Sequence, residues 1–212
     1  MALIHDATLS PSKAELLATW VPRQRWASGL TGDVALLGAY RFDDPEGEVG
    51  IEGHLVRLGG VVLHAPLTYR GAPLAGAEAS LVTEMHHSVL GTRYVYDGCA
   101  DVAFLRMLAV MALTGVGQAA QVVLAGSVVE TAAPSVRLDG SGRADDWIQI
   151  APFGTPADTE DGAATSVTTG DSTLRVVRRP AVSLDAVVRT GGMFVAAAWA
   201  GQAEHLVLAE LR

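Results

Sequence analysis

Short apolar segments separated by turn residues dominate residues 34–96. Each segment is rich in β-branched and aromatic residues, and Gly, Pro or Asp lies at or near its ends, which is typical of strands rather than helices. This pattern predicts an antiparallel sheet. Its expected strands are Val34–Phe42, Val49–Leu58, Val61–Tyr69, Leu81–Ser88 and Thr92–Tyr96.

The glycine pair at 59–60 sets the register of this sheet. Glycine readily takes positive φ angles, so the pair predicts a two-residue hairpin turn. In that register His54 and His64 lie on opposite faces and cannot share a metal ion, whereas a three-residue loop would put them opposite each other. The adjacent His86 and His87 also face opposite ways on their strand. The sequence therefore indicates no metal-ligand set.

Two helices are expected. The first begins at Ser12, which forms a capping box with Glu15, and it ends before Pro22. The second covers Ala100–Thr114 and is apolar nearly all round, so we expect the curved sheet to wrap it. Its expected core residues are Leu105, Leu108, Val110 and Leu113.

The chain beyond Gly115 reads mostly as strand again. The fold class is therefore α+β: a bent antiparallel sheet packed on an apolar helix in residues 1–117, followed by a smaller β-rich module in 118–212. The loop Pro152–Ala164 is expected to be mobile and solvated. The expected later strands are Gln121–Glu130, Ser135–Leu138, Trp147–Ala151, Thr165–Thr169, Thr173–Arg178, Met193–Trp199 and His205–Leu211.

Charge and hydropathy exclude several partners. The net charge of -8 over 212 residues opposes binding to nucleic acid, which needs clustered cations. No apolar run reaches the 18 or more residues that a membrane-spanning helix requires, and no secretory signal is visible. We expect a cytoplasmic protein with neither a nucleic-acid nor a membrane partner. The single Cys99 is interpreted as a core residue at a helix start.

Sequence motifs of common catalytic centres are missing from these residues. The chain has no G-x-x-x-x-G-K-[ST] loop, no G-x-G-x-x-G loop and no G-x-S-x-G elbow. Lys13 is its single lysine, so no expected strand carries a lysine to hold phosphates. We therefore assign no catalytic residue, no metal ligand and no cofactor.

Two local clusters remain as candidate binding residues. Trp20, Arg23, Arg25 and Trp26 place two cations between two aromatics, which either clamp an anion or stack Arg on Trp at a surface corner.

The second cluster lies at the junction between the sheet and the long helix. Here Asp97 or Asp101 caps the helix, Arg93 pairs with a carboxylate, and Tyr96 adds an aromatic group. These structural roles are sufficient to explain the residue types, so a binding role is compatible but not required.

Three short motifs in order resemble the N-terminal cap of actinobacterial maltokinases and related glucosamine kinases. The motifs are Trp20-Val21-Pro22-Arg23-Gln24-Arg25-Trp26, then Ala65-Pro66-Leu67-Thr68-Tyr69-Arg70, then His87-Ser88-Val89-Leu90-Gly91 with Tyr94-Val95-Tyr96-Asp97. The resemblance covers about residues 12–115. It implies an α+β cap and a setting in maltose, trehalose, glycogen or amino-sugar metabolism.

A weaker resemblance covers Thr165–Pro180, which is similar to the strands that open the kinase lobe of those enzymes. The position of the family's phosphate-contacting lysine corresponds to Arg175 here. The H-G-D-x-H catalytic loop is missing from the 212 residues. The resemblance thus implies a cap without its catalytic lobe.

Three functions follow as expectations. The first is a non-catalytic cap-like protein that binds or regulates a sugar kinase or glucan-metabolism enzyme. The second is a module that binds a sugar or sugar phosphate, and the third is an accessory part of an ATP-dependent sugar kinase acting with a separate catalytic chain. The candidate ligand-binding residues are Arg23, Arg25, Trp26, Arg93, Tyr96, Asp97 and Arg175.

Overall fold

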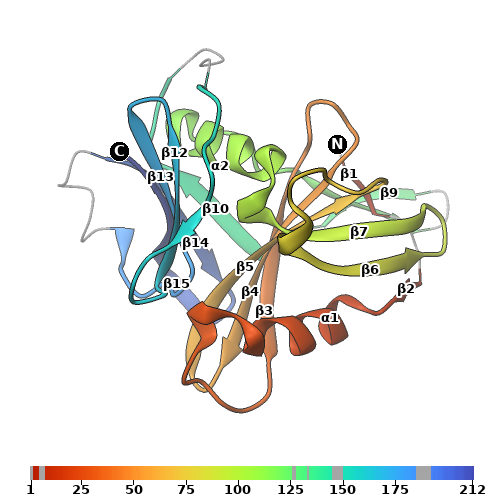
Figure 1. Ribbon diagram of the computed structural model, residues 1–212. Coiled ribbons are helices and arrows are strands. Elements are labelled where there is room, and N and C mark those ends of the chain that lie inside the picture. Colours follow the sequence, from red (N-terminus) through yellow and green to blue (C-terminus); the bar gives the residue numbers. More distant parts are fainter. Residues whose placement is uncertain (1, 5–7, 126–127, 133, 145–149, 185–191) are drawn as a thin grey trace.

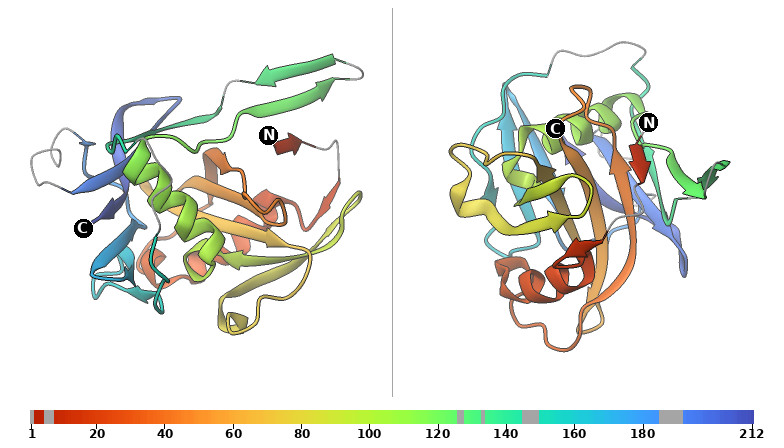
Figure 2. Two further views of the ribbon diagram at one scale, coloured as in Figure 1. Left: turned by 90° about the horizontal axis from the view of Figure 1, so that it is seen from above. Right: turned by 90° about the vertical axis from the view of Figure 1, so that its right-hand side faces the viewer.

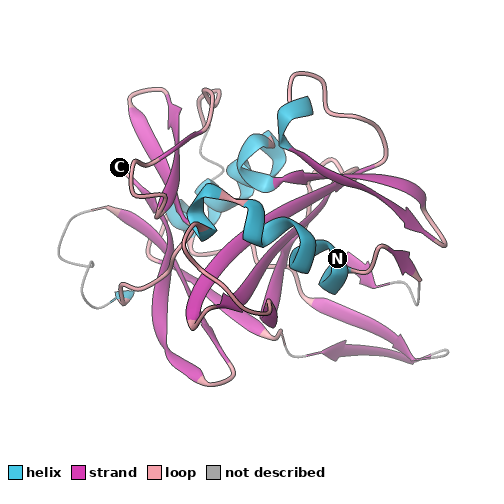
Figure 3. Cartoon of the chain, turned by 60° about the horizontal axis from the view of Figure 1, so that its bottom comes forward, coloured by secondary structure: helices cyan, strands magenta, loops and turns pink. Residues whose placement is uncertain are grey.

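Two six-stranded antiparallel sheets and one helix between them make up most of the fold (Figure 1). The computed structural model describes residues 2–4, 8–125, 128–132, 134–144, 150–184 and 192–212. Strands clearly outnumber helices (Figure 3). The predicted α+β class, with an antiparallel sheet packed on a helix, is confirmed.

The first sheet contains the five predicted strands and one that was not predicted, β2, in the order β2-β6-β7-β5-β4-β3. The bounds are β2 Leu9–Ser10, β3 Ala35–Phe42, β4 Gly50–Leu58, β5 Val61–Arg70, β6 Leu81–His87 and β7 Gly91–Asp97. Gly59 and Gly60 have φ angles of 57° and 80°, as the two-residue turn requires. His54 pairs with Ala65, one position away from His64, so the two histidines lie on opposite faces, as predicted.

The second sheet has the order β10-β14-β15-β13-β12-β11 and is as large as the first by strand count. Its bounds are β10 Val136–Gly140, β11 Ala157–Asp158, β12 Ala164–Thr169, β13 Ser172–Val177, β14 Met193–Trp199 and β15 Gln202–Leu211. The single strand predicted for Gln121–Glu130 is wrong, because two strands, β8 Gln121–Ala125 and β9 Val128–Ala132, form a hairpin there. β1 (Ala2–Ile4) pairs parallel with β8.

Another predicted strand, Trp147–Ala151, lies mostly outside the described residues. Its described end, residues 150–151, is not part of a strand.

Helix α1 (Lys13–Trp20) begins with the predicted capping box. The Ser12 hydroxyl accepts from the Glu15 amide at 3.3 Å, and the Glu15 carboxylate accepts from the Ser12 amide at 2.8 Å. The lysine of α1, Lys13, then reaches Glu52 on β4 at 2.7 Å. Glu52 is buried, so this ion pair fastens the start of α1 to the first sheet.

Helix α2 (Val102–Thr114) lies between the two sheets and packs on β5 of the first and on β10, β14 and β15 of the second. Asp101 caps it by accepting from the Ala103 amide at 2.9 Å, and Gly115 ends it with a φ of 74°. Its buried residues are Phe104, Leu105, Met107, Leu108, Ala109, Met111 and Ala112. The expectation for Val110 and Leu113 is wrong: both are half-buried, because α2 keeps one flank toward solvent.

One hydrophobic core joins the two sheets across the proposed boundary after residue 117. It contains Tyr40 and Ile51 from the first sheet, Leu108 from α2, and Leu174 and Val195 from the second sheet. Gly53 on β4 makes room for this core, because a Cβ there would overlap the ring of Tyr40. The division into 1–117 and 118–212 stays a prediction.

We predict that Leu108→Asp unfolds the protein. Leu108 is fully buried; losing such a side chain costs about 2–5 kcal/mol, and burying a carboxylate costs several more, against a typical stability of about 5–15 kcal/mol. Thermal unfolding followed by circular dichroism measures the effect.

The matched control is Val102→Asp, in the first turn of the same helix at 45% exposure. It should change stability by less than about 0.5 kcal/mol. A Leu108→Asp protein that keeps the wild-type melting temperature would show that α2 is peripheral.

Candidate functional site at the junction of the two sheets

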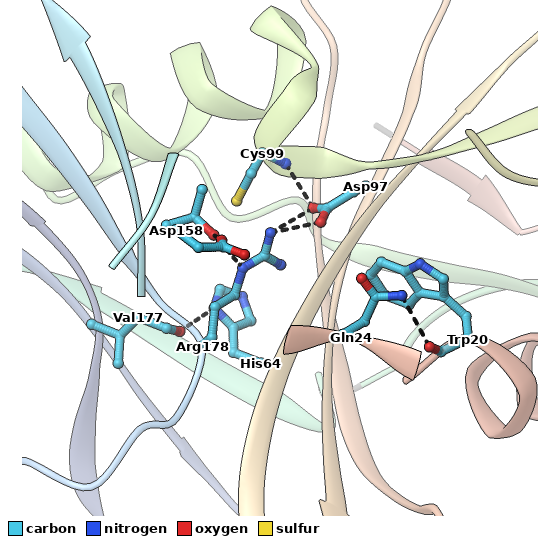
Figure 4. A network of polar contacts seen from close by, with 9 residues as sticks. Trp20, Gln24, His64, Asp97, Cys99, Asp158, Val177 and Arg178 are labelled. Atoms are coloured by element: carbon cyan, nitrogen blue, oxygen red, sulfur yellow. Dashed lines mark hydrogen bonds and ion pairs between the residues drawn. The ribbon is translucent and has the colours of Figure 1, made fainter. Parts of the chain in front are cut away.

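A buried arginine links the two sheets. Arg178 follows β13 directly and is 1% exposed. Its Nη2 donates to both carboxylate oxygens of Asp97, at 2.8 and 2.7 Å, and its Nε donates to the Thr165 hydroxyl at 2.9 Å (Figure 4). Asp97 ends β7 of the first sheet and Thr165 lies on β12 of the second, so one guanidinium bridges both.

The same guanidinium stacks on an aromatic corner. The Cζ atom of Arg178 lies 5.3 Å from the centre of the Trp26 ring, and the rings of Trp20 and Trp26 meet edge to face at 5.6 Å. The next residue, Arg179, donates to the carbonyls of Trp26 at 2.6 Å and Ser28 at 3.0 Å. Two consecutive arginines therefore hold this corner against the second sheet.

His64 occupies the floor of the junction as a neutral side chain. Its Nδ1 donates to the carbonyl of Val177 at 3.1 Å, since a carbonyl only accepts, and its Nε2 accepts from the Tyr40 hydroxyl at 2.8 Å. Burial and the nearby charge of Arg178 lower the pKa of His64 to about 3. The His64 amide also donates to the Arg178 carbonyl at 2.9 Å.

Cys99 lies beside this network and is buried, as predicted for a core residue at a helix start. Burial raises the pKa of its thiol, so it stays protonated at neutral pH. Its amide donates to Asp97 at 3.0 Å, which adds a further hydrogen bond to that carboxylate.

A comparison with protein families identifies the first half of this junction. Residues 20–101 match the model of the maltokinase N-terminal cap domain. These residues are similar to a maltokinase N-terminal cap domain, and we call residues 20–101 the cap domain. The match runs from the last residue of α1 to Asp101, the cap of α2, and includes Trp26 and Asp97. No curated protein matches the chain.

The aromatic corner of the cap domain differs from its expected form. The cation stacked on Trp26 is Arg178 rather than Arg23 or Arg25. Arg25 instead donates to the Glu160 carbonyl at 3.2 Å, and Arg23 is exposed and makes no hydrogen bond with a described residue. The Trp26 indole therefore stacks on an arginine from a distant segment of the chain, and the neighbouring arginines are not needed for this contact.

The carboxylate partner expected for Arg93 is a second correction. Arg93 donates to the carbonyl of Leu90 at 3.0 Å, and no described carboxylate pairs with it. The two acids of the segment pair elsewhere: Asp97 with Arg178, and Asp101 with Arg70 at 2.6 and 2.7 Å.

The remaining candidate residues of the cap domain and the second sheet lie in different surroundings. Tyr96 is buried, and its hydroxyl accepts from the Leu74 amide at 2.9 Å. Arg175 is half-buried on β13 opposite Glu210. The structure therefore brings together only Trp26 and Asp97 of the predicted set, through Arg178. A ligand-binding role for these residues stays a prediction.

Sequence reasoning missed Arg178, Thr165 and His64 as members of one site. The sequence does carry one signal for this site: two arginines stand directly after an apolar strand and before Pro180. A charge in that position is expected to be buried and therefore to need a partner. The identity of that partner, 81 residues away, is not readable from spacing.

The loop Pro152–Ala164 is exposed over most of its length, as expected for a solvated loop, but it is also anchored by hydrogen bonds. Its mobility stays a prediction. β11 pairs with β12, and the Thr165 hydroxyl donates to Asp158 at 2.6 Å. Asp161 accepts from the Thr159 hydroxyl and from the Ala163 amide. These contacts hold the loop against Arg25 of the cap domain.

A second buried polar cluster lies in the cap domain around Glu52. Arg41 approaches this carboxylate at 3.4 Å and His54 at 3.4 Å, in addition to Lys13. Burial alone would raise the pKa of Glu52, but the hydrogen bond from His54 and the charges of Lys13 and Arg41 lower it below its usual range. The cluster holds an ionised carboxylate inside the sheet.

Two further findings concern the described part of the chain. Its helices are all too short or too polar to cross a membrane. No group of three His, Cys, Asp or Glu among its residues could hold a metal ion.

We predict that Arg178→Gln destabilises the protein by about 3–5 kcal/mol, because it leaves the carboxylate of Asp97 without its cation inside the junction. Urea unfolding measures the loss. The matched control is Arg175→Gln, three residues earlier, because the Arg175 side chain makes no hydrogen bond with a described residue; this variant should stay within about 0.5 kcal/mol of wild type. If Arg178→Gln costs the same in an Asp97→Asn background, the two residues are not coupled.

We predict that His64 makes the protein less stable as the pH falls below about 6.5. Its folded pKa of about 3 lies below the unfolded value, so its unfolded form takes up a proton first. The loss is about 1.4 kcal/mol per pH unit, or about 2 kcal/mol between pH 6.5 and 5. Urea unfolding across that range should show this slope in wild type and a shallower slope in His64→Gln.

The exposed His86 provides the control for this measurement. His86→Gln should keep the wild-type slope. Equal slopes in wild type and His64→Gln would mean that His64 is not held neutral in the folded protein.

Proposed function

We propose that this chain is a non-catalytic cap-like protein that binds or regulates a sugar kinase or an enzyme of glucan metabolism. The observation that carries the proposal is the cap domain at residues 20–101, fixed to the second sheet by Arg178 and Arg179. A cap held in one position is suited to present a surface to a kinase-type catalytic part.

The junction supports a positioning role because most of its strong polar groups hydrogen-bond to one another, although the buried Nη1 of Arg178 has no hydrogen-bond partner among the described residues. Asp97 accepts from Arg178 and from the Cys99 amide, and Thr165 accepts from Arg178 while it donates to Asp158. Burial opposes the charge of Arg178, but Asp97 raises its pKa, so it remains a cation. Groups engaged in this way fix geometry and leave little capacity for a substrate.

The second sheet supports the non-catalytic part of the proposal. Arg175 takes the place of the kinase lysine in the sequence resemblance, and it lies opposite Glu210 on β15. A planar guanidinium does not reproduce the point contact of a lysine with phosphates. Phosphoryl transfer depends almost entirely on such positioned charges.

The proposal is tested by purifying the tagged chain from its native host at native expression and identifying what elutes with it. We expect a sugar kinase or glucan enzyme in the complex. The chain alone should give background in a coupled assay with ATP, Mg2+ and maltose, glucose or glucosamine, whereas a kinase in the complex should turn over.

The control is the same tag on an unrelated acidic protein. Absence of any carbohydrate enzyme from the complex would contradict the association. Turnover by the chain alone that survives repurification and disappears in Arg175→Ala would contradict the non-catalytic assignment.

A sugar or sugar-phosphate binding module is the second candidate, favoured by one hollow at the end of α2. Its volume is about 630 Å3, within the range of small-molecule sites. Its described lining includes Asp139, Ser141, Arg143 and His205 but no Trp or Tyr on which a sugar could stack. Thermal stabilisation by a sugar or sugar phosphate, abolished in Asp139→Ala, would favour this function over partner binding.

A further inference from the structure

The hollow at the end of α2 contains an arginine that is both fixed in place and exposed. It lies where the last turn of α2 meets the second sheet (Figure 2, left). The Nη1 of Arg143 donates to the carbonyls of Gly140 at 2.8 Å and Gly142 at 2.5 Å. The Arg143 residue is nevertheless exposed, and no described carboxylate pairs with it. An exposed guanidinium that the neighbouring backbone holds still is a preformed site for an anionic group.

The acid in the lining of the hollow, Asp139, already has its partners. Its Oδ2 lies 2.6 Å from the Nε2 of His205 and 3.8 Å from the Nε of Arg137. Its side chain is 49% exposed, so the second oxygen, Oδ1, can still accept a hydrogen bond from a ligand. Because Arg137 balances the charge of Asp139, the described groups at the hollow keep one uncompensated positive charge, that of Arg143.

The carbonyl end of α2, which would otherwise disfavour an anion, is closed by the neighbouring loop. The Gly142 amide donates to the Ala112 carbonyl at 2.8 Å, and the Ala144 amide donates to the Leu113 carbonyl at 3.1 Å. Gly140 and Gly142 permit this approach, because a Cβ at either position would overlap a backbone carbonyl of α2. The negative end of a helix dipole resides on unpaired carbonyls, so its repulsion of an anion is reduced here.

Ser141 adds a second positioned group to the hollow. Its amide donates to the Phe194 carbonyl at 2.9 Å, and its hydroxyl accepts from the Phe194 amide at 2.7 Å. A hydroxyl that accepts in this way still has its own proton to donate. The loop at 140–143 is thus fastened to β14 as well as to α2, and the hollow is formed before any ligand arrives.

We propose that this hollow binds a small anion that carries hydroxyl groups, a phosphorylated or carboxylated polyol, with its anionic group on Arg143 and a hydroxyl on Asp139. The described lining has no Trp or Tyr on which a neutral polyol could stack, so charge has to supply much of the affinity. An amine or a metal cation is a poor occupant, because Arg143 repels it and Asp139 already has its cation.

The test compares four probes at about 10 mM and constant ionic strength: glucose 6-phosphate, gluconate, glucose and inorganic phosphate. Thermal unfolding of the purified full chain is followed by fluorescence. At least one of the two hydroxylated anions should raise the melting temperature by about 3–5 °C, the shift that a ligand at ten times its Kd gives a chain of this length. The anion that does so identifies the recognised group as phosphate or carboxylate. Glucose should bind at least about tenfold more weakly, since it lacks the charge-assisted hydrogen bond.

Arg143→Gln should remove most of this shift, because it deletes the charge of the site. The matched control is Arg57→Gln, an exposed arginine on β4 outside the hollow, which should respond to the probes like wild type. Arg143→Lys keeps the positive charge and should keep the preference for the anion over glucose. The comparison of probes on the wild-type chain stays decisive if Arg143→Gln does not fold.

Three results would overturn the proposal. The first is the absence of a shift with either hydroxylated anion. The second is an equal shift with glucose or with inorganic phosphate, because the hollow would then ignore either the charge or the hydroxyl groups. The third is a shift that Arg143→Gln leaves unchanged.

The proposal narrows the second candidate function from any sugar to hydroxylated anions, and it does not depend on the cap-like role. The two proposals therefore fail separately. Association with a carbohydrate enzyme is read from co-purification, whereas ligand selection is read from the purified chain. Equal stabilisation by glucose would leave a sugar-binding module in place and exclude only the selection for an anion.

Discussion

The buried guanidinium of Arg178 is the contact on which the arrangement of the two sheets depends. It satisfies an acid at the end of β7, a hydroxyl on β12 and the face of Trp26 at once. Such a group is costly to bury unless it is paired, so each partner has to be in position before the junction closes. The site therefore couples the cap domain to the second sheet more specifically than apolar packing alone, which tolerates small shifts.

Much of the cap domain could be predicted from local patterns, because the causes of its structure are local. The capping box at Ser12, the glycine turn before Val61 and the apolar α2 depend on residues a few positions apart. The long apolar stretch from Gln121 was harder to interpret, because only two residues, Gly126 and Ser127, interrupt it and the residues on both sides are equally apolar.

The candidate site was only partly predictable because its contacts join distant segments. Trp26 and Asp97 were singled out, but the cation for both came from residue 178 instead of from the nearby Arg23, Arg25 or Arg93. Local spacing favours neighbouring residues as partners, whereas in the fold the partner is a buried cation whose other side-chain hydrogen bond goes to the neutral hydroxyl of Thr165. The sequence could indicate that a charged cluster exists, but not which distant arginine completes it.

Gln118 follows Gly115 and Gly117, so its stretch of sequence has the composition of a flexible linker. In the structure, however, hydrogen bonds fix this stretch to both sheets. The amide side chain of Gln118 pairs with Val136 and Leu138, and the next amide, that of Ala119, donates to the carbonyl of Arg41. A hinge needs residues whose torsions change without breaking contacts, and these residues lack that freedom. Relative motion of the two sheets is therefore suppressed at the point where the composition would place it. A protein that docks on this chain meets a surface whose shape is set beforehand, so little of the binding free energy is spent on reorganisation.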